Sequence, residues 1–226
     1  MKNLSKPFFF IATICFIVAF FLTCLDVISF NRSFYDSEYN KLGVAETIGI
    51  SDVELKETTT VLLDYIQDKR DDLNVSANIL GQQRQVFNEK EIMHMVDVKI
   101  LYQNAMLVKM LGWIGCIGFG ILGIITDKKN ALKNGTEMFL MGTVFSLSLI
   151  VFLGLYAIID FEQFWLQFHY VFFTNDLFFL DPSKDILIQM VPSQFFFDLV
   201  FRIAGSFLIG MVILCSGCIY VRRKRL

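Results

Sequence analysis

PFFFIATICFIVAFFLTCLDVISF, residues 7–30, decides the fold class, because only one charged residue, Asp26, interrupts an apolar run long enough to cross a membrane. A hydrocarbon core about 30 Å thick requires about 20 residues of helix. Three further runs meet this requirement, at residues 100–125, 138–159 and 195–220. With 55% hydrophobic residues and a mean hydropathy of +0.56, the chain is predicted to be an all-α membrane protein with four transmembrane helices.

The first run follows Lys2 and Lys6 and therefore has the charge of a secretory signal. Its apolar stretch is longer than the roughly 7–15 residues of a signal peptide, and no cleavage motif of small residues follows it. Residues 21–24, FLTC, come close to a lipoprotein cleavage motif, but Thr23 stands where a small residue is expected. We interpret the run as a retained membrane anchor.

Charged residues in the flanks predict the orientation, because cytoplasmic segments of membrane proteins carry an excess of Lys and Arg. Such residues concentrate in three segments: before the first run, between the second and third runs, and after the fourth run. They are Lys2, Lys6, Lys128, Lys129, Lys133, Arg222, Arg223, Lys224 and Arg225. Acidic residues outnumber basic ones in the two remaining segments. Both termini are therefore expected in the cytoplasm, with the working surface outside the membrane.

These boundaries predict a single integral membrane domain over residues 1–226. Its order is a first helix at about 7–30, an extracytoplasmic segment at 31–99, a second helix at about 100–125, a cytoplasmic loop at 126–137, a third helix at about 138–159, an extracytoplasmic segment at 160–194, a fourth helix at about 195–220 and a cytoplasmic tail at 221–226.

The first extracytoplasmic segment is too long for a bare connector, and its helix signals predict a helical cap. Ser51 with Glu54 reads as a capping box that opens a helix, with Val53, Leu62, Tyr65 and Ile66 near one face. Asn88 with Glu91 predicts a second start, and this helix can run through His94 into the second span.

The second extracytoplasmic segment is dominated by aromatic residues, which an interfacial belt at the membrane surface explains for the most part. Its aromatic residues are Phe161, Phe164, Trp165, Phe168, Tyr170, Phe172, Phe173, Phe178 and Phe179. Asp181 followed by Pro182 predicts an N-cap and a short helix near 182–190.

The chain has two histidines, His94 and His169, and both are predicted at the outer membrane surface. An ordinary pKa near 6.5 suits histidine to proton transfer at neutral pH. On a helix, Asp97 shares a face with His94 and can orient its ring. Interfacial histidines without a chemical role are the alternative. The polar residues set into the aromatic segment favour a site: Asn175, Asp176, Asp181 and Asp185.

Three ionisable residues fall within the predicted spans, at Asp26, Lys109 and Arg202, all in the expected outer leaflet. Charge at membrane depth is costly and tends to face a bundle interior or a cavity. The three residues can therefore bind a lipid headgroup, a carbonyl group or one another. The alternative is that Lys109 and Arg202 extend to the interface.

The remaining patterns indicate no cofactor, no metal and no nucleic-acid partner. All five cysteines lie in apolar runs, where cysteine packs as a small hydrophobic residue. Cys215 and Cys218 form a CxxC without the second pair of ligands that a zinc site requires. Motifs of serine hydrolases, P-loop proteins and zinc proteases are absent from the sequence.

Two stretches carry a resemblance to a known family: HMVDVK at residues 94–99 and HYVFFTNDLFFLDPSKDILIQMVPSQFFFD at residues 169–198. The chain resembles the bacterial lipoprotein intramolecular transacylase (Lit) family, in the order of its four spans as well as in both outer segments. The resemblance implies an acyltransferase of the cytoplasmic membrane whose partners are diacylglyceryl-modified lipoproteins and membrane lipid.

The implied reaction moves the sn-2 acyl chain of the diacylglyceryl group onto the α-amine of the N-terminal cysteine and yields a lyso-form lipoprotein. With this chemistry, His94 and His169 are expected to act as general base and general acid in an order left open. Asp97 would orient His94, and Lys99, Lys109 and Arg202 would contact the oxyanion or carbonyl. A covalent acyl-enzyme is not excluded by the sequence.

Two other functions fit the topology. A noncatalytic tetraspan adaptor would share the large first and smaller second outer segment. A metal-responsive membrane accessory protein would use His94, His169 and nearby carboxylates as ligands.

Overall fold

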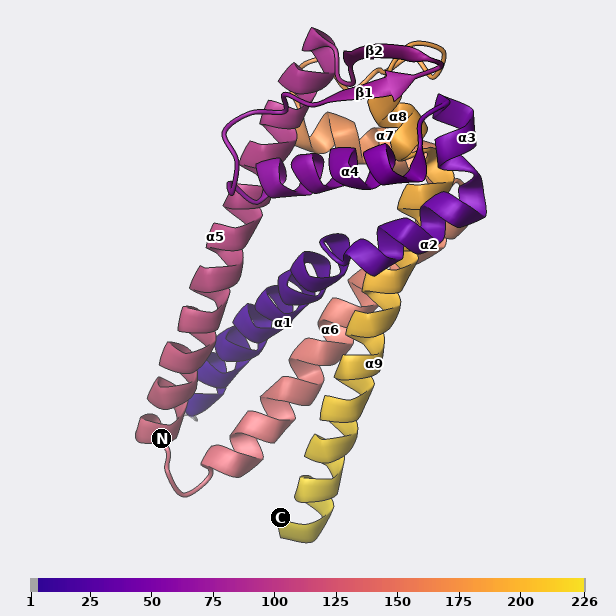
Figure 1. Ribbon diagram of the computed structural model, residues 1–226. Helices are drawn as coiled ribbons and strands as arrows, with labels where there is room; N and C mark the ends of the chain where they lie inside the picture. Colours follow the sequence, from indigo (N-terminus) through magenta and orange to yellow (C-terminus); the bar gives the residue numbers. More distant parts are fainter. Residues whose placement is uncertain (1–3, 226) are drawn as a thin grey trace. The chain divides into compact units, whose positions relative to one another are not determined.

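The computed structural model describes residues 4–225 and is built mainly from helices (Figure 1). Lys2 lies outside the described residues, as does the side chain of Arg225. Four helices are long and apolar enough to cross a membrane, and they confirm the predicted fold class. They are α1 (Ser5–Ser29), α5 (Glu89–Thr126), α6 (Ala131–Ile159) and α9 (Ser193–Arg225).

The described chain divides into two compact units, a subdivision of the predicted single domain that hydropathy did not indicate. The first unit comprises residues 1–27, 105–159 and 201–226, and the second comprises residues 28–104 and 160–200. The long helices α1, α5 and α9 each contribute to both units.

In the first unit, α1 packs against the other three long helices, because its small and aromatic side chains face each of them. Phe16 contacts Trp113 of α5 and Phe139 of α6, with ring centroids 5.6 and 5.8 Å away. Phe20 contacts the fully buried Phe207 of α9 at 5.5 Å. Because lipid tails are as apolar as these rings, close packing rather than hydrophobicity holds such helices together.

Gly112 allows a close backbone approach between α5 and α1. A methyl group at this position would lie 3.1 Å from the carbonyl oxygen of Cys15 and 3.0 Å from the side chain of Ala19. Small residues at helix interfaces in membranes permit this kind of contact.

The connector between α5 and α6 is shorter than the loop predicted at 126–137, since α6 begins at Ala131. The predicted loop residues Lys133 and Glu137 are helical, and Lys6 Nζ pairs with Glu137 Oε1 at 2.9 Å. Asn134 is buried and donates from Nδ2 to Ser5 Oγ at 2.9 Å. Satisfied polar side chains therefore extend the helix into the part that composition marked as a loop.

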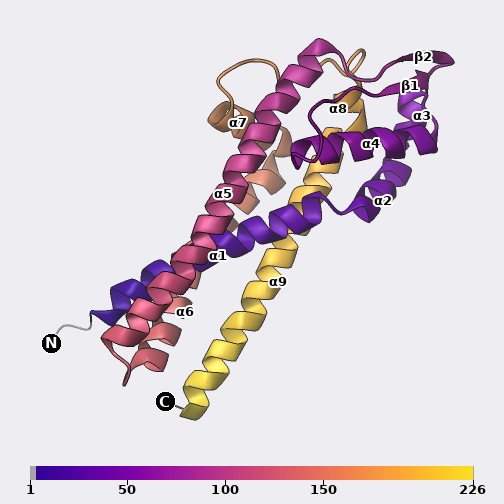
Figure 2. The same ribbon diagram turned by 60° about the vertical axis from the view of Figure 1, so that its left-hand side comes forward.

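The second unit contains the shorter elements, and it includes a hairpin that was not predicted in the helical cap. The helices are α2 (Arg32–Leu42), α3 (Val44–Ile48), α4 (Asp52–Ile66), α7 (Phe161–Phe172) and α8 (Ile186–Met190). Strands β1 (Ser76–Ile79) and β2 (Gln82–Gln85) pair antiparallel, with Ser76 opposite Gln85 and Ile79 opposite Gln82. Figures 1 and 2 both show α4 running beside this hairpin.

Phe195 lies at an aromatic centre of the second unit and is fully buried. Its ring lies 5.0–6.0 Å from those of Phe34, Tyr35 and Tyr39 on α2. Gly49, with φ of +73°, accepts a hydrogen bond from Leu80 and leaves no space for a side chain, because a methyl group there would lie 2.3 Å from Leu80. The start of α9 and the hairpin are thus tied to the helices of this unit.

The helix α4 begins as predicted, whereas its buried face differs from the prediction. Glu54 N–H donates to Ser51 Oγ at 3.3 Å, as a capping box requires. Leu62 and Tyr65 are buried as expected. The prediction is wrong for Val53, because 67% of its surface is exposed. Leu55 is buried in its place.

The start of α5 is confirmed, and that of the helix after Pro182 is not. Asn88 and Glu91 exchange hydrogen bonds, and α5 runs unbroken from Glu89 to Thr126. The predicted helix at 182–190 is only α8, which begins at Ile186 with Asp185 at its N-cap. Asp181 instead accepts from Ser183 N–H at 2.9 Å and so closes a turn that delays the helix.

Candidate functional site

The two histidines come from different elements of the second unit and lie side by side. His94 is in the first turns of α5, and His169 is in the last turn of α7. Their ring centroids are 6.1 Å apart with an interplanar angle of 31°. The structure therefore brings together the pair that the sequence singled out.

Aromatic rings surround this pair. Phe173 contacts both imidazoles, at 5.4 Å from His94 and 5.7 Å from His169. His169 also lies 4.8 Å from Phe178 and meets the edge of Trp165 at 5.1 Å. His94 is 7% exposed, so little water reaches its ring.

The hydrogen bond of His169 fixes its neutral tautomer. Nδ1 lies 2.7 Å from the carbonyl oxygen of Trp165, one turn earlier in α7. Since a carbonyl oxygen only accepts, Nδ1 carries the proton in the neutral ring. Nε2 is then the nitrogen with the lone pair that can accept a proton.

His94 lies before the apolar run that begins at residue 100, so we treat it as outside the membrane-spanning part of α5. Its Nδ1 is buried and has no hydrogen-bond partner among the described residues. Burial lowers the pKa of His94 to about 4, and the neighbouring His169 adds to this shift. Burial also lowers the pKa of His169, whereas its hydrogen bond to the Trp165 carbonyl acts in the opposite direction and raises it. Both rings are therefore neutral at pH 7.

Asp97 binds the loop after α7. Asn175 Nδ2 donates to Asp97 Oδ2 at 2.8 Å. These residues line a pocket of about 150 Å³ whose other walls are Ile100, Leu101, Asn104, Phe172, Phe173 and Thr174. Phe173 thus forms part of the pocket wall and also touches both histidine rings.

Glu91 is a buried residue of this region whose role sequence reasoning missed, beyond its part in the helix start. It is 1% exposed, and its carboxylate accepts from Leu187 N–H at 2.6 Å and from Asn88 N–H at 2.7 Å. Asn88 Nδ2 in turn donates to Asp185 Oδ1 at 2.7 Å. The turn of α5 that precedes His94 is therefore bound to the start of α8.

Replacing Glu91 by glutamine is expected to lower the free energy of unfolding by about 1–3 kcal/mol, because the new amide group would place a donor against a buried N–H. The measurement is thermal or chemical unfolding of the purified protein in detergent. Glu89→Gln, which removes an exposed carboxylate of the same helix, is the control. Equal stability of the two variants would show that Glu91 does not hold this junction.

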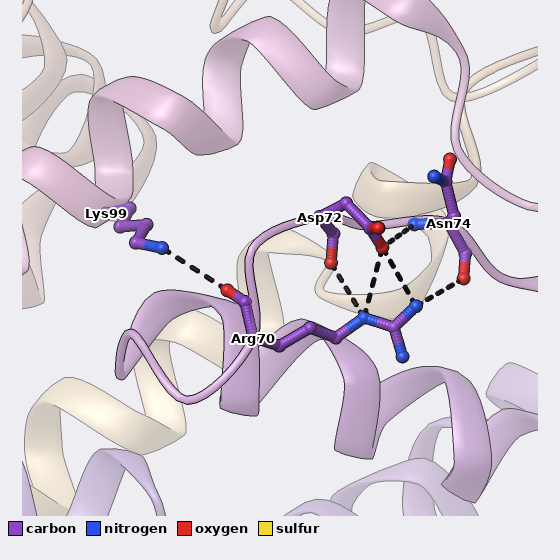
Figure 3. A network of polar contacts seen from close by, with 4 residues as sticks. All are labelled: Arg70, Asp72, Asn74 and Lys99. Carbon is purple, nitrogen blue, oxygen red and sulfur yellow. Dashed lines mark hydrogen bonds and ion pairs between the residues drawn. The ribbon is translucent and has the colours of Figure 1, made fainter.

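Lys99 is directed to a different part of the second unit (Figure 3). Its Nζ pairs with Asp68 at 2.7 Å, donates to the carbonyl of Arg70 at 3.3 Å and lies 4.5 Å from the ring centre of Tyr65. Arg70 continues this network through its guanidinium, which binds Asp72 at 2.9 Å. These contacts give Lys99 a structural role at the end of α4.

The three acidic residues proposed near His169 have separate placements. Asp176 accepts from Phe179 N–H through its backbone carbonyl. Asp181 closes the turn before α8, and its own N–H donates to Asp185 at 2.6 Å. Asp185 is buried and bonded to Asn88. Of the polar group in this segment, Asn175 is the residue that lines the pocket.

The ionisable residues of the predicted spans belong to the first unit. Lys109 Nζ and Asp26 Oδ2 form an ion pair of 2.6 Å between α5 and α1, with both side chains 23% exposed. Arg202 lies in α9, in the same unit. The structure therefore joins Asp26 to Lys109, one of the outcomes that the sequence left open.

No group of three or more potential metal ligands is found among residues 4–225. The arrangement that the structure does provide is a pair of neutral imidazoles, one with a defined acceptor nitrogen. Such a pair can move a proton and donate a hydrogen bond in a site that aromatic rings partly shield from water.

Four apolar spans and this histidine pair define a multi-pass membrane protein with a candidate catalytic site. The model of the family described as lipoprotein intramolecular transacylase Lit matches residues 10–196. The chain therefore belongs to the Lit family, a family of membrane-integral proteins named for acyl transfer within lipoproteins.

Individual proteins are also similar to this chain over most of its length. An uncharacterized protein of Aquifex aeolicus (strain VF5) is 26% identical over 202 residues, which cover 84% of each chain. The solved structure of Lit from Bacillus cereus has a TM-score of 0.76 and 22% identity, covering 100% of this chain and 99% of that one. A structure of the same protein with a histidine substitution has a TM-score of 0.73 and 22% identity, covering 98% and 93%. Both solved structures have the same fold as this chain.

Proposed function

We propose that this protein transfers the sn-2 acyl chain of a diacylglyceryl lipoprotein to the α-amine of the N-terminal cysteine, giving the N-acylated lyso-form. The observation that carries the proposal is the histidine pair, in which the buried His94 and the half-buried His169 lie 6.1 Å apart. Membership of the Lit family supports the reaction class. Donor and acceptor belong to one molecule, so the site has mainly to hold amine and ester in attack geometry.

His169 is the general base in this proposal. Its Nδ1–H is bound to the Trp165 carbonyl, so Nε2 receives the proton as the amine attacks the ester carbonyl. A carbon–nitrogen bond forms and the carbonyl π bond opens to an oxyanion. When the intermediate collapses, the ester carbon–oxygen bond breaks, and the protonated His169 returns the proton to the glycerol oxygen. The step consumes no other reactant.

His94 acts as a neutral hydrogen-bond donor to the oxyanion. Its lowered pKa, about 4, keeps it uncharged at pH 7, and a neutral imidazole still carries one N–H. Because its Nδ1 has no partner among the described residues, the ring can turn its donor to the substrate. A donor preorganised where charge develops lowers the barrier. The sequence predicted a general base and a general acid. In this proposal His169 serves as both, and His94 is a hydrogen-bond donor to the oxyanion.

The direct test is the chemical form of lipoproteins in cells with and without the gene. N-terminal lipopeptides should carry an N-acyl group and one O-acyl chain in cells that have the gene. Deletion should leave the diacylglyceryl form with a free amine, read by peptide mass spectrometry. Identical lipopeptides from both strains would contradict the proposal.

We also propose that both termini are cytoplasmic and that residues 31–99 and 160–194 face outward, in the bacterial cytoplasmic membrane. The distribution of Lys and Arg supports this orientation. Reporter fusions after Asn40 and Lys184 should report an extracytoplasmic location, and fusions after Lys133 and Leu226 a cytoplasmic one. A cytoplasmic signal from the fusion at Asn40 would overturn it.

The lowered histidine pKa values predict the pH profile of kcat/KM. The substrate α-amine, with a reference pKa of about 7.7–8.0, should give a slope of one in the logarithmic plot below pH 8. The base His169 is deprotonated above its own pKa, which burial places below 6.5, so the slope should stay at one through pH 6.5 and rise only at lower pH. A change of slope from one to two at pH 6.5 would mean that the pKa of His169 is not lowered in the protein.

A further inference from the structure

The pocket described above lies on the face of α5 that carries His94. Asp97, Leu101 and Asn104 follow His94 at helical intervals of three, seven and ten residues, so all four side chains share that face. Phe173 forms the opposite wall and touches both imidazoles. A group held in this pocket is therefore next to the reacting centre.

The pocket is a depression open to the surface, and its volume matches that of a small group held at its base. Its volume of about 150 Å³ equals that of an engineered protein cavity that binds benzene, a molecule of about six non-hydrogen atoms. The α-nitrogen, Cα, Cβ, sulfur, carbonyl carbon and oxygen of one cysteine residue make about the same number.

The negative charge of Asp97 favours a positively charged ligand group in the pocket. Asp97 carries a carboxylate, and Asn175 holds its Oδ2 at 2.8 Å. No donor from residues 4–225 bonds to Oδ1, which leaves this oxygen for a ligand. A charge-assisted hydrogen bond to an ammonium group is roughly twice as strong as a neutral one. One turn earlier on α5, the buried His94 has an unpartnered Nδ1 and lies against Phe173, which forms part of the pocket wall.

From these observations we infer that the pocket binds the N-terminal cysteine residue of the lipoprotein, with Asp97 bonded to its α-ammonium group. The inference rests on the proposed function and specifies how that site recognises the acceptor. Asp97 acts as a binding residue, Asn175 positions its carboxylate, and the acyl and glycerol parts lie outside the pocket. A lipopeptide whose amine is missing loses this contact.

The test measures binding without turnover, in the full-length His169→Ala protein in bicelles. Two synthetic diacylglyceryl lipopeptides are compared, identical except that hydrogen replaces the α-amino group in one. The amine form should bind about 10- to 100-fold more tightly, the range for hydrogen bonds to charged groups. Adding Asp97→Asn should reduce this preference to within about threefold, whereas adding Glu89→Gln, an exposed carboxylate on the same helix, should leave it unchanged.

A second substitution tests the pocket itself. Asn104→Phe, in a protein whose unfolding temperature matches the parent, should fill the space and weaken binding of the amine form. Equal binding of the two lipopeptides to the parent, or a preference that survives Asp97→Asn, would overturn the inference. Unaltered binding in Asn104→Phe would also overturn it. Turnover of the wild-type protein is measured in parallel, because failure of transfer there contradicts the proposed function and not the pocket alone.

Discussion

Alanine in place of His169 is expected to reduce acyl transfer by about 10²- to 10⁴-fold, the usual cost of losing a positioned proton-transfer group. Alanine in place of His94 should cost about 10²- to 10³-fold, the usual cost of losing an oxyanion donor. The two rings lie 6.1 Å apart and share Phe173 as a neighbour, so they should act as one unit. The double variant should then be scarcely slower than the slower single variant, since effects within a unit are not additive. The rate is that of the purified proteins on a diacylglyceryl lipopeptide.

Stability measurements must accompany these rates, because His94 is buried and its removal leaves a cavity. Unfolding of each variant in detergent separates a folded but inactive protein from a disordered one. Near-normal rates in both folded single variants would refute the histidine mechanism while leaving the family assignment intact. Rates that multiply in the double variant would mean that the two rings act independently.

Breaking the ion pair within the spans should have the second large effect. Asp26→Leu removes the carboxylate 2.6 Å from Lys109 Nζ, and a charged side chain at membrane depth costs about 2.5–3.5 kcal/mol on insertion scales. We expect Asp26→Leu to lower the free energy of unfolding by about 3–5 kcal/mol, the range for breaking a buried pair. The double variant Asp26→Leu, Lys109→Leu should regain much of this loss, because it leaves no lysine charge behind.

The chain offers a matched control in Lys6 and Glu137, a pair that is 32% and 36% exposed. Glu137→Leu should cost no more than about 1 kcal/mol, as for exposed pairs. Unfolding of all four proteins is measured in the same bicelles. If Asp26→Leu were as mild as Glu137→Leu, or if the double variant were less stable than Asp26→Leu, Lys109 would be stabilised by the interface rather than by its partner.

Hydropathy predicted the four spans because the length of an apolar helix is fixed by the bilayer. The starts of α4 and α5 were also predictable, since Ser51 with Glu54 and Asn88 with Glu91 are local hydrogen-bond patterns. The hairpin was not. Strand β2 is polar and exposed throughout, and the turn places the non-glycine Leu80 at a φ of +52° before Gly81 at +83°. The local signals are thus limited to the alternation of the four residues of β1 and to one turn glycine, which are too weak to indicate a hairpin.

The residues of the site were predictable only in part. The two histidines were candidates because the chain has no others and both fell at one predicted surface. The second contact of Glu91 joins it to Leu187, 96 residues later, and no local pattern reveals such a bond. Lys99 was predicted as an oxyanion or carbonyl contact from the reaction that the resemblance implies, and the structure turns its side chain toward Asp68 and Tyr65.

The most direct test of the proposed reaction follows the acyl chain itself. A diacylglyceryl lipopeptide with an isotope-labelled chain at sn-2 only is incubated with the purified protein, and mild alkali then removes the remaining esters while sparing amides. Mass spectrometry should find the labelled chain on the cysteine nitrogen, and a substrate labelled at sn-1 should give an unlabelled amide. A product that retains its free amine, or one acylated from sn-1, would contradict the account.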